Sequence, residues 1–176
     1  MKKRILAVFA TAIVVMLCFF AYKTNQKYKH DKAIALQKQN LPNFQFYNQN
    51  VEKFSAALLK PNIPVCIFYY NTDCEHCQYE ATQISKYAPL FKNIQVLMVS
   101  VNTPAQVRAF AKTYQLSSYP YITWLYDKDY EFFKWFGHSP TPSVFIYNQK
   151  HMLVKEYRGE VKPGAIVKYL KDAKKS

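Results

Sequence analysis

The pattern of hydrophobic and polar positions divides the chain into three parts. An uncharged, mostly apolar run occupies residues 5–22, and a polar segment with weak helical character follows it. As a helix, the apolar run would be about 27 Å long, close to the roughly 30 Å thickness of a bilayer's hydrocarbon core. The pattern therefore predicts a transmembrane anchor at residues 1–22, a polar tether at 23–40 and one compact domain at 41–176.

Within this domain, strand-like and helix-like segments alternate. The predicted strands are near-continuous β-prone runs, at residues 44–47, 65–70, 93–101, 143–147 and 152–157. Helical spacing is found at residues 51–59 (with Asn50 as N-cap), 74 to about 87, 103–114, about 128–136 and about 162–173. Strands separated by helices come first, and a hairpin followed by a helix comes last. This order predicts a mixed α/β fold with a parallel half and an antiparallel half.

Composition and charge restrict the function. The chain has only 3 glycines, which lie too far apart for a phosphate-binding loop. Its 24 basic residues against 11 acidic ones could indicate nucleic acid or an anionic membrane as a partner. Because the lysines are scattered and the domain is expected to be exported, we expect no nucleic-acid binding. An exported surface beside an anionic membrane accounts better for the charge.

The residues around the apolar run predict its orientation. Lys2, Lys3 and Arg4 precede the run, which favours a cytoplasmic N-terminus. No pair of small residues suited to signal-peptide cleavage follows the run, so we expect the anchor to be retained. The sequence thus predicts a single-pass protein of the cytoplasmic (inner) membrane, with its domain on the periplasmic or extracytoplasmic side.

The strongest chemical signal is Cys74-Glu75-His76-Cys77, at the junction of a predicted strand and a predicted helix. If the helix begins at Cys74, the unpaired N–H groups at its positive end favour the thiolate of that residue. Cys77 would lie one turn further and could attack a mixed disulfide formed on Cys74. The pair is therefore suited to disulfide exchange.

Zinc binding, a static disulfide and peroxidase chemistry are the alternatives to exchange for this cysteine pair. A structural zinc site needs a second pair of ligands, and neither another Cys-x-x-Cys nor a His-x₃₋₅-His pair occurs, so we expect no metal. A static structural disulfide is an alternative in an exported domain. A peroxidase signature ending at Cys74 is absent, because Ile67 and Asn71 stand where it requires a proline and a hydroxyl residue.

Three features together resemble the thioredoxin-like superfamily: the Cys-x-x-Cys motif after a strand, the Leu41-Pro42-Asn43-Phe44 opening, and Thr141-Pro142 before the hairpin. The chain is most similar to anchored, exported thiol-disulfide oxidoreductases of the TlpA/ResA type, over roughly residues 41–173. The resemblance implies a thioredoxin-like fold, with a mixed central sheet flanked by helices behind the transmembrane helix. It also implies exported protein thiols or disulfides as partners, an upstream membrane electron donor and no cofactor.

The resemblance further implies three catalytic residues. Cys74 would be the attacking cysteine and Cys77 the resolving one. Glu80 completes a Cys-x-x-Cys-x-x-Glu pattern and would assist proton transfer.

Substrate contacts are implied for four more residues. Pro142 would be a cis-proline that faces the cysteine pair and shapes the substrate groove. Thr141 would offer backbone hydrogen bonds to an extended partner. Glu75 and His76, between the cysteines, would border the same groove.

Two departures from the family pattern concern the surroundings of Cys74. Asp73 stands directly before it, where the family usually has a tryptophan, and Phe68 replaces the buried acidic residue of thioredoxins proper. The carboxylates of Asp73 and Glu75 oppose thiolate formation, whereas a protonated His76 favours it. The direction of the net redox reaction therefore stays open.

A copper-binding metallochaperone is the alternative function. His138 lies close to Pro142 in the sequence and could complete a copper site with Cys74 and Cys77. Thioredoxin-like proteins of the Sco type use two cysteines and a distant histidine, although three residues separate their cysteines. Cys66, inside a predicted strand, is expected to be a core residue rather than a redox centre.

Overall fold

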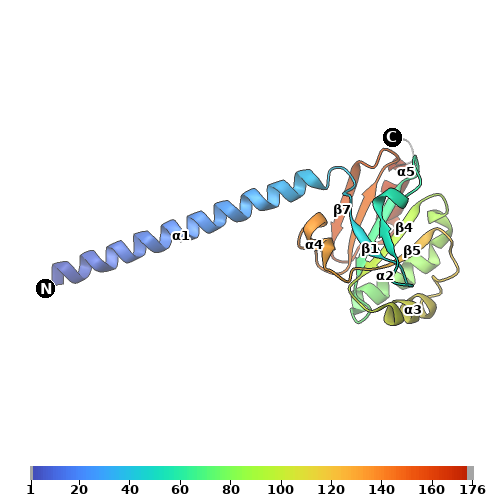
Figure 1. The fold of residues 1–176 in the computed structure, drawn as a ribbon, viewed down its shortest axis with the longest axis horizontal. Coiled ribbons are helices and arrows are strands. Elements are labelled where there is room, and N and C mark those ends of the chain that lie inside the picture. The colour runs from blue at the N-terminus through green and yellow to red at the C-terminus, as the bar shows by residue number, and fades with distance from the viewer. Residues whose placement is uncertain (1, 174–176) are drawn as a thin grey trace.

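The computed structural model describes residues 2–173, in which a mixed sheet of seven strands carries helices on both faces and follows one long N-terminal helix (Figure 1). The strands are β1 (Gln45–Tyr47), β2 (Lys53–Ser55), β3 (Val65–Tyr70), β4 (Gln95–Ser100), β5 (Ile122–Tyr126), β6 (Ser143–Tyr147) and β7 (Leu153–Arg158). The helices are α1 (Lys2–Gln37), α2 (Glu75–Lys86), α3 (Pro104–Thr113), α4 (Glu131–Phe136) and α5 (Pro163–Ala173), with short 3₁₀ turns η1 (Ala56–Leu58) and η2 (Ala88–Phe91).

The sheet has the predicted parallel and antiparallel halves. Its strand order is β2-β1-β5-β4-β3-β6-β7. Strands β3, β4 and β5 are parallel, and β6 pairs antiparallel with both β3 and β7. All six residues of β3 are buried, including Cys66, as the continuous apolar run predicts for a central strand. The carboxyl end of this strand leads directly into the cysteine motif.

Two hydrophobic clusters fill the space on either side of the sheet. The first contains Cys77 from α2, Phe110 from α3 and Ile166 from α5. The second contains Phe132 and Phe136 from α4. Helices α2, α3 and α5 therefore cover one face and α4 covers the other, which confirms the predicted layered α/β architecture.

The helix predicted over residues 51–59 is wrong, because this segment forms strand β2 and the turn η1. The side-chain oxygen of Asn48 accepts hydrogen bonds from the N–H groups of Asn50 (2.9 Å) and Glu52 (3.0 Å). These bonds close a tight turn that starts a hairpin instead of a helix. Asn50 is thus part of the turn and caps no helix.

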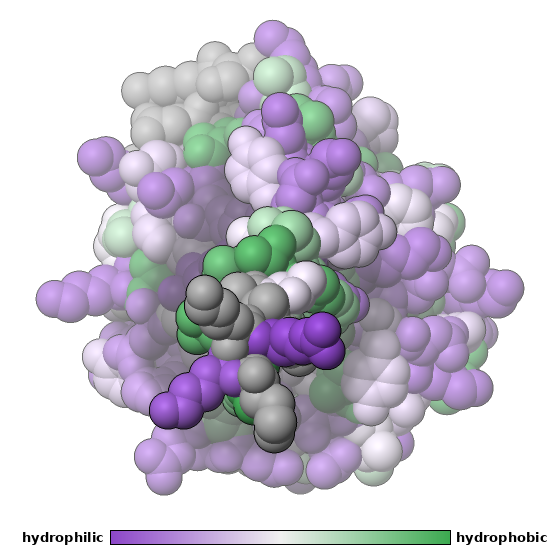
Figure 2. All heavy atoms as spheres, turned by 90° about the vertical axis from the view of Figure 1, so that its left-hand side faces the viewer, coloured by the Kyte–Doolittle hydropathy of each residue, from purple (hydrophilic) through white to green (hydrophobic). Residues whose placement is uncertain are grey.

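Helix α1 includes both the apolar run and the polar segment that follows it. Among residues 2–173, it is the one helix long and apolar enough to cross a membrane. The polar segment continues the same helix as far as Gln37, which adds about 22 Å beyond residue 22. The domain surface that surrounds the helix in the view along it is largely hydrophilic (Figure 2).

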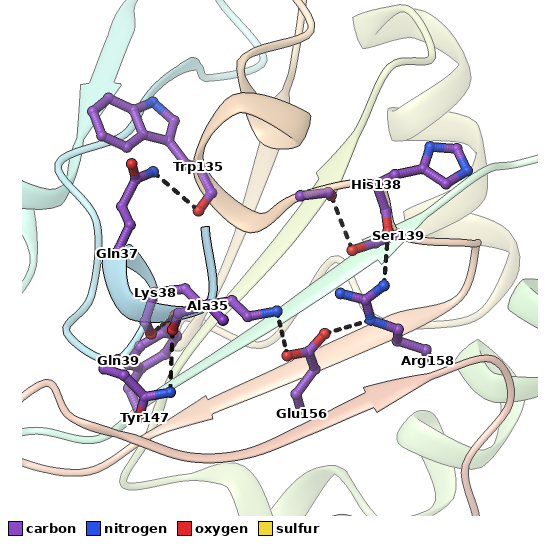
Figure 3. A network of polar contacts seen from close by, with 11 residues as sticks. Ala35, Gln37, Lys38, Gln39, Trp135, His138, Ser139, Tyr147, Glu156 and Arg158 are labelled. Carbon is purple, nitrogen blue, oxygen red and sulfur yellow. Dashed lines mark hydrogen bonds and ion pairs between the residues drawn. The ribbon is translucent and has the colours of Figure 1, made fainter. Parts of the chain in front are cut away.

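The last turns of α1 pack against the end of α4. The side-chain amide of Gln37 donates to the backbone oxygens of Lys134 (3.2 Å) and Trp135 (3.3 Å), as Figure 3 shows for Trp135. Gly137 ends α4 with φ of 77°, and a Cβ atom there would lie 3.0 Å from Cγ2 of Ile34. A glycine at this position therefore permits the close approach of α1.

A buried ion pair connects the end of α1 to the loop before Pro142 (Figure 3). Lys38 Nζ lies 2.6 Å from Oε2 of Glu156, and the Lys38 side chain is 8% exposed. Arg158 pairs with the other oxygen of Glu156 and donates to the backbone oxygen of His138 at 3.0 Å. Specific side-chain contacts therefore join the end of α1 to the domain.

We expect Gly137→Ala to lower the free energy of unfolding by about 2 kcal/mol, because an alanine is strained at positive φ and would crowd Ile34. Urea unfolding of the full chain in detergent micelles measures this loss. Gly159→Ala is the matched control, since Gly159 has φ of 91° and open space around its Cβ position. Equal losses in the two variants would contradict the contribution of the contact with Ile34.

Candidate active site

The turn before Cys74 is held by two asparagines that follow neighbouring parallel strands. The side-chain oxygen of Asn71, after β3, accepts from the N–H of Asp73 at 2.9 Å. That of Asn102, after β4, accepts from the N–H of Thr72 at 3.0 Å. Neither asparagine was predicted to support the site, although polar residues at the ends of adjacent parallel strands are a usable signal. Together they set the path of the chain into α2, where Cys74 is the N-cap residue.

The two cysteines of the motif differ in access. Cys74 is partly exposed, and its Sγ lies 3.6 Å from the backbone oxygen of Thr141. Cys77 is only 2% exposed, and its Sγ accepts from the N–H of Asn71 at 3.5 Å. Burial raises the pKa of the Cys77 thiol to about 12. Both are free thiols in this structure, so the site presents one accessible sulfur and one covered sulfur.

The peptide bond between Thr141 and Pro142 is cis, as the resemblance implies. Pro142 is buried directly before β6, which lies beside β3. Its backbone oxygen accepts from the N–H of Gly159 at 2.8 Å, while the oxygen of Thr141 faces Cys74. Residues separated by more than sixty positions in the sequence thus meet at the exposed sulfur.

Glu80 is buried one turn beyond Cys77 on α2. It is 3% exposed and accepts from the backbone N–H of Val161, while its Oε1 atom has no hydrogen-bond partner among the described residues. Burial raises the pKa of this carboxyl to about 8, and the negative charge of Glu160 adds to the rise. Glu80 is therefore protonated over most of the neutral range.

The residues between the cysteines are exposed. His76 Nδ1 lies 2.7 Å from Oε2 of Glu160, whereas Glu75 has no polar partner among the described residues. Glu160 belongs to the loop between β7 and α5, and the adjacent Val161 contacts Glu80. This loop was not predicted as part of the site, and no local motif marks it.

The structure does not bring His138 to the cysteine pair. Its ring packs against Phe133 with centroids 5.5 Å apart, on the α4 side of the loop. Among residues 2–173, no three His, Cys, Asp or Glu side chains form a group that could hold a metal ion. The copper site of Cys74, Cys77 and His138 is therefore not formed, which is a correction to the alternative function.

Sequence comparison places this fold and site among known proteins. Residues 37–156 match the AhpC/TSA family. The thiol-disulfide oxidoreductase ResA of Bacillus subtilis is 25% identical over 172 residues, which cover 96% of this chain and 93% of the relative. ResA of Bacillus thuringiensis is 26% identical over 110 residues, 61% of each protein.

Solved structures share the fold. A secreted disulfide oxidoreductase of Mycobacterium tuberculosis, homologous to Escherichia coli DsbE, superposes with a TM-score of 0.64 at 15% identity, covering 74% of this chain and 96% of that one. StoA of Bacillus subtilis gives 0.57 at 16% identity, covering 72% and 94%. These likenesses confirm the thioredoxin-like fold that the motifs predict. Because the family match extends over well more than half of the sequence, the chain belongs to the AhpC/TSA family of thioredoxin-like proteins.

Proposed function

We propose that this chain is a membrane-anchored thiol-disulfide oxidoreductase that exchanges disulfides with exported proteins through Cys74 and Cys77. The unequal access of the two sulfurs carries the proposal. An attacking thiol must be reachable by a partner, and a resolving thiol need only reach the mixed disulfide. The names of the ResA and DsbE-like relatives support the same reaction class.

In the reducing direction, the Cys74 thiolate attacks a disulfide of the partner. A new S–S bond forms between Cys74 and one partner sulfur, the old bond breaks, and the other partner sulfur leaves as a thiolate that takes up a proton. Cys77 then loses its proton and attacks the Cys74 sulfur, which releases the second partner thiol. Two electrons pass to the partner, and the Cys74–Cys77 pair is left oxidised. The same steps run backwards when the pair acts as an oxidant.

Glu80 is the proposed proton acceptor for Cys77. The Cys77 thiol has a pKa of about 12, so its deprotonation at neutral pH needs a nearby base. Glu80 lies one turn away on α2, has a pKa of about 8 and keeps one carboxylate oxygen unbonded. With this pKa only the ionised minority of Glu80 accepts a proton at neutral pH, and that fraction grows toward pH 8, whereas the protonated form can return a proton to Cys77.

We propose that four residues contact the partner around the exposed sulfur: Thr141, Pro142, Glu75 and His76. Thr141 already faces Cys74 through its backbone oxygen, and Glu75 and His76 are exposed at the first turn of α2. An extended partner segment would lie along the cis-proline loop with its reacting cysteine above Cys74.

The anchor completes the proposal. The apolar part of α1 has the length and composition of a membrane span, and basic residues precede it. We propose that residues 1–22 anchor the chain in the cytoplasmic membrane and that residues 41–176 act outside it. An upstream membrane electron donor would return electrons to the pair if the net reaction is reductive.

Trapping in cells tests this function. In a Cys77→Ser variant the mixed disulfide cannot be resolved, so we expect exported proteins to accumulate covalently on Cys74, visible as reductant-sensitive bands on non-reducing gels. The Cys74→Ser/Cys77→Ser double variant is the control, because it retains Cys18 and Cys66. Bands that persist in the double variant, or their absence in Cys77→Ser, would contradict the proposal.

A further inference from the structure

A small groove begins at Asp73, the residue directly before Cys74, and extends toward α3. It has a volume of about 290 Å³, runs between the start of α2 and the face of α3, and is lined by Thr72, Asp73, Gln78, Gln106, Phe110 and Thr113 among others. In the sheet, β4, which precedes α3, lies on one side of β3 and β6 lies on the other. The groove therefore extends toward the β4 side of β3, whereas the cis-proline loop leads into β6 on its other side.

Asp73 supplies the one charged side chain among the lining residues of this groove. Its Oδ1 atom accepts from the hydroxyl of Thr72 at 3.3 Å, and no described residue bonds its Oδ2 atom. The backbone of the turn is held by Asn71 and Asn102, so the carboxylate is positioned in advance. In the proposed exchange steps Asp73 neither forms a bond nor transfers a proton.

The charged residues next to Cys74 in the sequence are acidic, although the chain as a whole is basic. The chain carries a formal charge of +13, yet no lysine or arginine occurs between Lys60 and Lys86. Asp73 and Glu75 are exposed on either side of Cys74, and Glu160 reaches the same helix end through His76. The exposed carboxylates beside Cys74 therefore attract a basic partner segment at the cysteine pair.

We propose that this groove is a subsite for a lysine or arginine side chain adjacent to the reacting cysteine of the partner, with Asp73 as the residue that determines this specificity. The inference rests on the proposed function, because it concerns which cysteines Cys74 attacks. The cation would pair with the free Oδ2 atom of Asp73, and the aliphatic stem would lie against the uncharged walls of the groove, which include Ala109, Phe110 and Tyr114.

Short peptides with one cysteine, activated as a mixed disulfide with thionitrobenzoate, test the subsite. The residue beside the cysteine is lysine in one peptide and glutamate in the other, and the coloured thiolate released on attack reports the rate. The reduced full-length protein in neutral detergent is used. We expect the lysine peptide to react about fivefold to tenfold faster at low salt, and this ratio to approach one in about 1 M salt.

In Asp73→Asn, the ratio of the rate with the lysine peptide to the rate with the glutamate peptide should fall below about twofold. The Asp129→Asn control, on the α4 side of the sheet, should keep the wild-type ratio. Because the reactivity of Cys74 affects both peptides equally, a change in that reactivity cancels from the ratio. Three outcomes would overturn the subsite. The lysine-to-glutamate rate ratio could be near one in the wild type, unchanged in Asp73→Asn, or lost only in Glu75→Gln. Failure of the wild type to react faster than Cys74→Ser with either peptide would instead refute the proposed function.

Discussion

Replacing Cys74 by serine is expected to slow disulfide exchange at least about 10³-fold, because the reaction loses its only accessible nucleophile among the described residues of the site. A serine hydroxyl cannot form the S–S bond through which the electrons pass. Cys77 cannot substitute for it, since its thiol is covered and has a pKa of about 12. Turnover of an oxidised protein substrate by the full chain in detergent, with a dithiol reductant, measures the loss.

The other two cysteines provide the controls for this experiment. Cys18 lies in α1 and Cys66 lies fully buried in β3. Cys18→Ser and Cys66→Ala should therefore retain wild-type turnover per folded molecule, although the second removes core packing and lowers stability. Retained turnover in Cys74→Ser would show that exchange does not depend on the proposed pair, and turnover lost in Cys18→Ser would show that a thiol outside the pair takes part.

The parts of the fold that could be predicted are those with a strong local pattern. The continuous apolar run of β3 has one favourable placement, at the centre of the sheet, and the structure puts it there. The hairpin at β2 was missed because apolar spacing over residues 51–59 fits a helix equally well. The deciding interaction is the Asn48 side chain, which closes a turn just before the segment begins. The spacing of apolar residues carries no information about a side-chain hydrogen bond of this kind.

In the site, too, residues that belong to local motifs could be predicted, whereas contacts between distant parts of the sequence could not. Cys74, Cys77 and the cis bond before Pro142 were predictable because each belongs to a short motif. Glu160 was not, since it meets His76 across 84 positions and only the packing of α5 brings its loop to α2.

His138 illustrates the opposite error, in which closeness along the sequence suggested closeness in space. Its backbone oxygen is bound by Arg158, and its ring packs on Phe133 of α4. These contacts hold it on the α4 side of the sheet, whereas Cys77 belongs to the cluster on the other side. A residue four positions before Pro142 can thus lie away from the site that Pro142 borders.

Replacing Glu80 by glutamine is expected to stabilise the protein increasingly as the pH rises. Burial raises the pKa of this carboxyl from 4.5 to about 8. Between these values the unfolded chain ionises Glu80 and the folded chain does not, so the folded state binds more protons. The free energy of unfolding then falls with rising pH until the folded carboxyl ionises near pH 8. Glutamine keeps an acceptor for the N–H of Val161 and has no proton to lose.

The interval from pH 6 to pH 8 isolates this effect. Burial also raises the pKa values of Asp127 and Cys77 and lowers that of His151, but the wild type and the variant share these groups, so their contributions cancel from the difference in stability. We expect the stability advantage of Glu80→Gln over the wild type to grow by about 2–3 kcal/mol across the interval. Urea unfolding of the full chain in detergent micelles, followed by tryptophan fluorescence, measures it at each pH.

Glu75→Gln is the matched control, because Glu75 stands on the same helix but is exposed and has no polar partner among the described residues. Its stability should follow that of the wild type at every pH within about 0.5 kcal/mol. If the stability of Glu80→Gln also followed that of the wild type at every pH, the Glu80 carboxyl would be ionised in the folded wild type at neutral pH. Glu80 would then be a permanent base beside Cys77, and proton return to that thiol would need another donor.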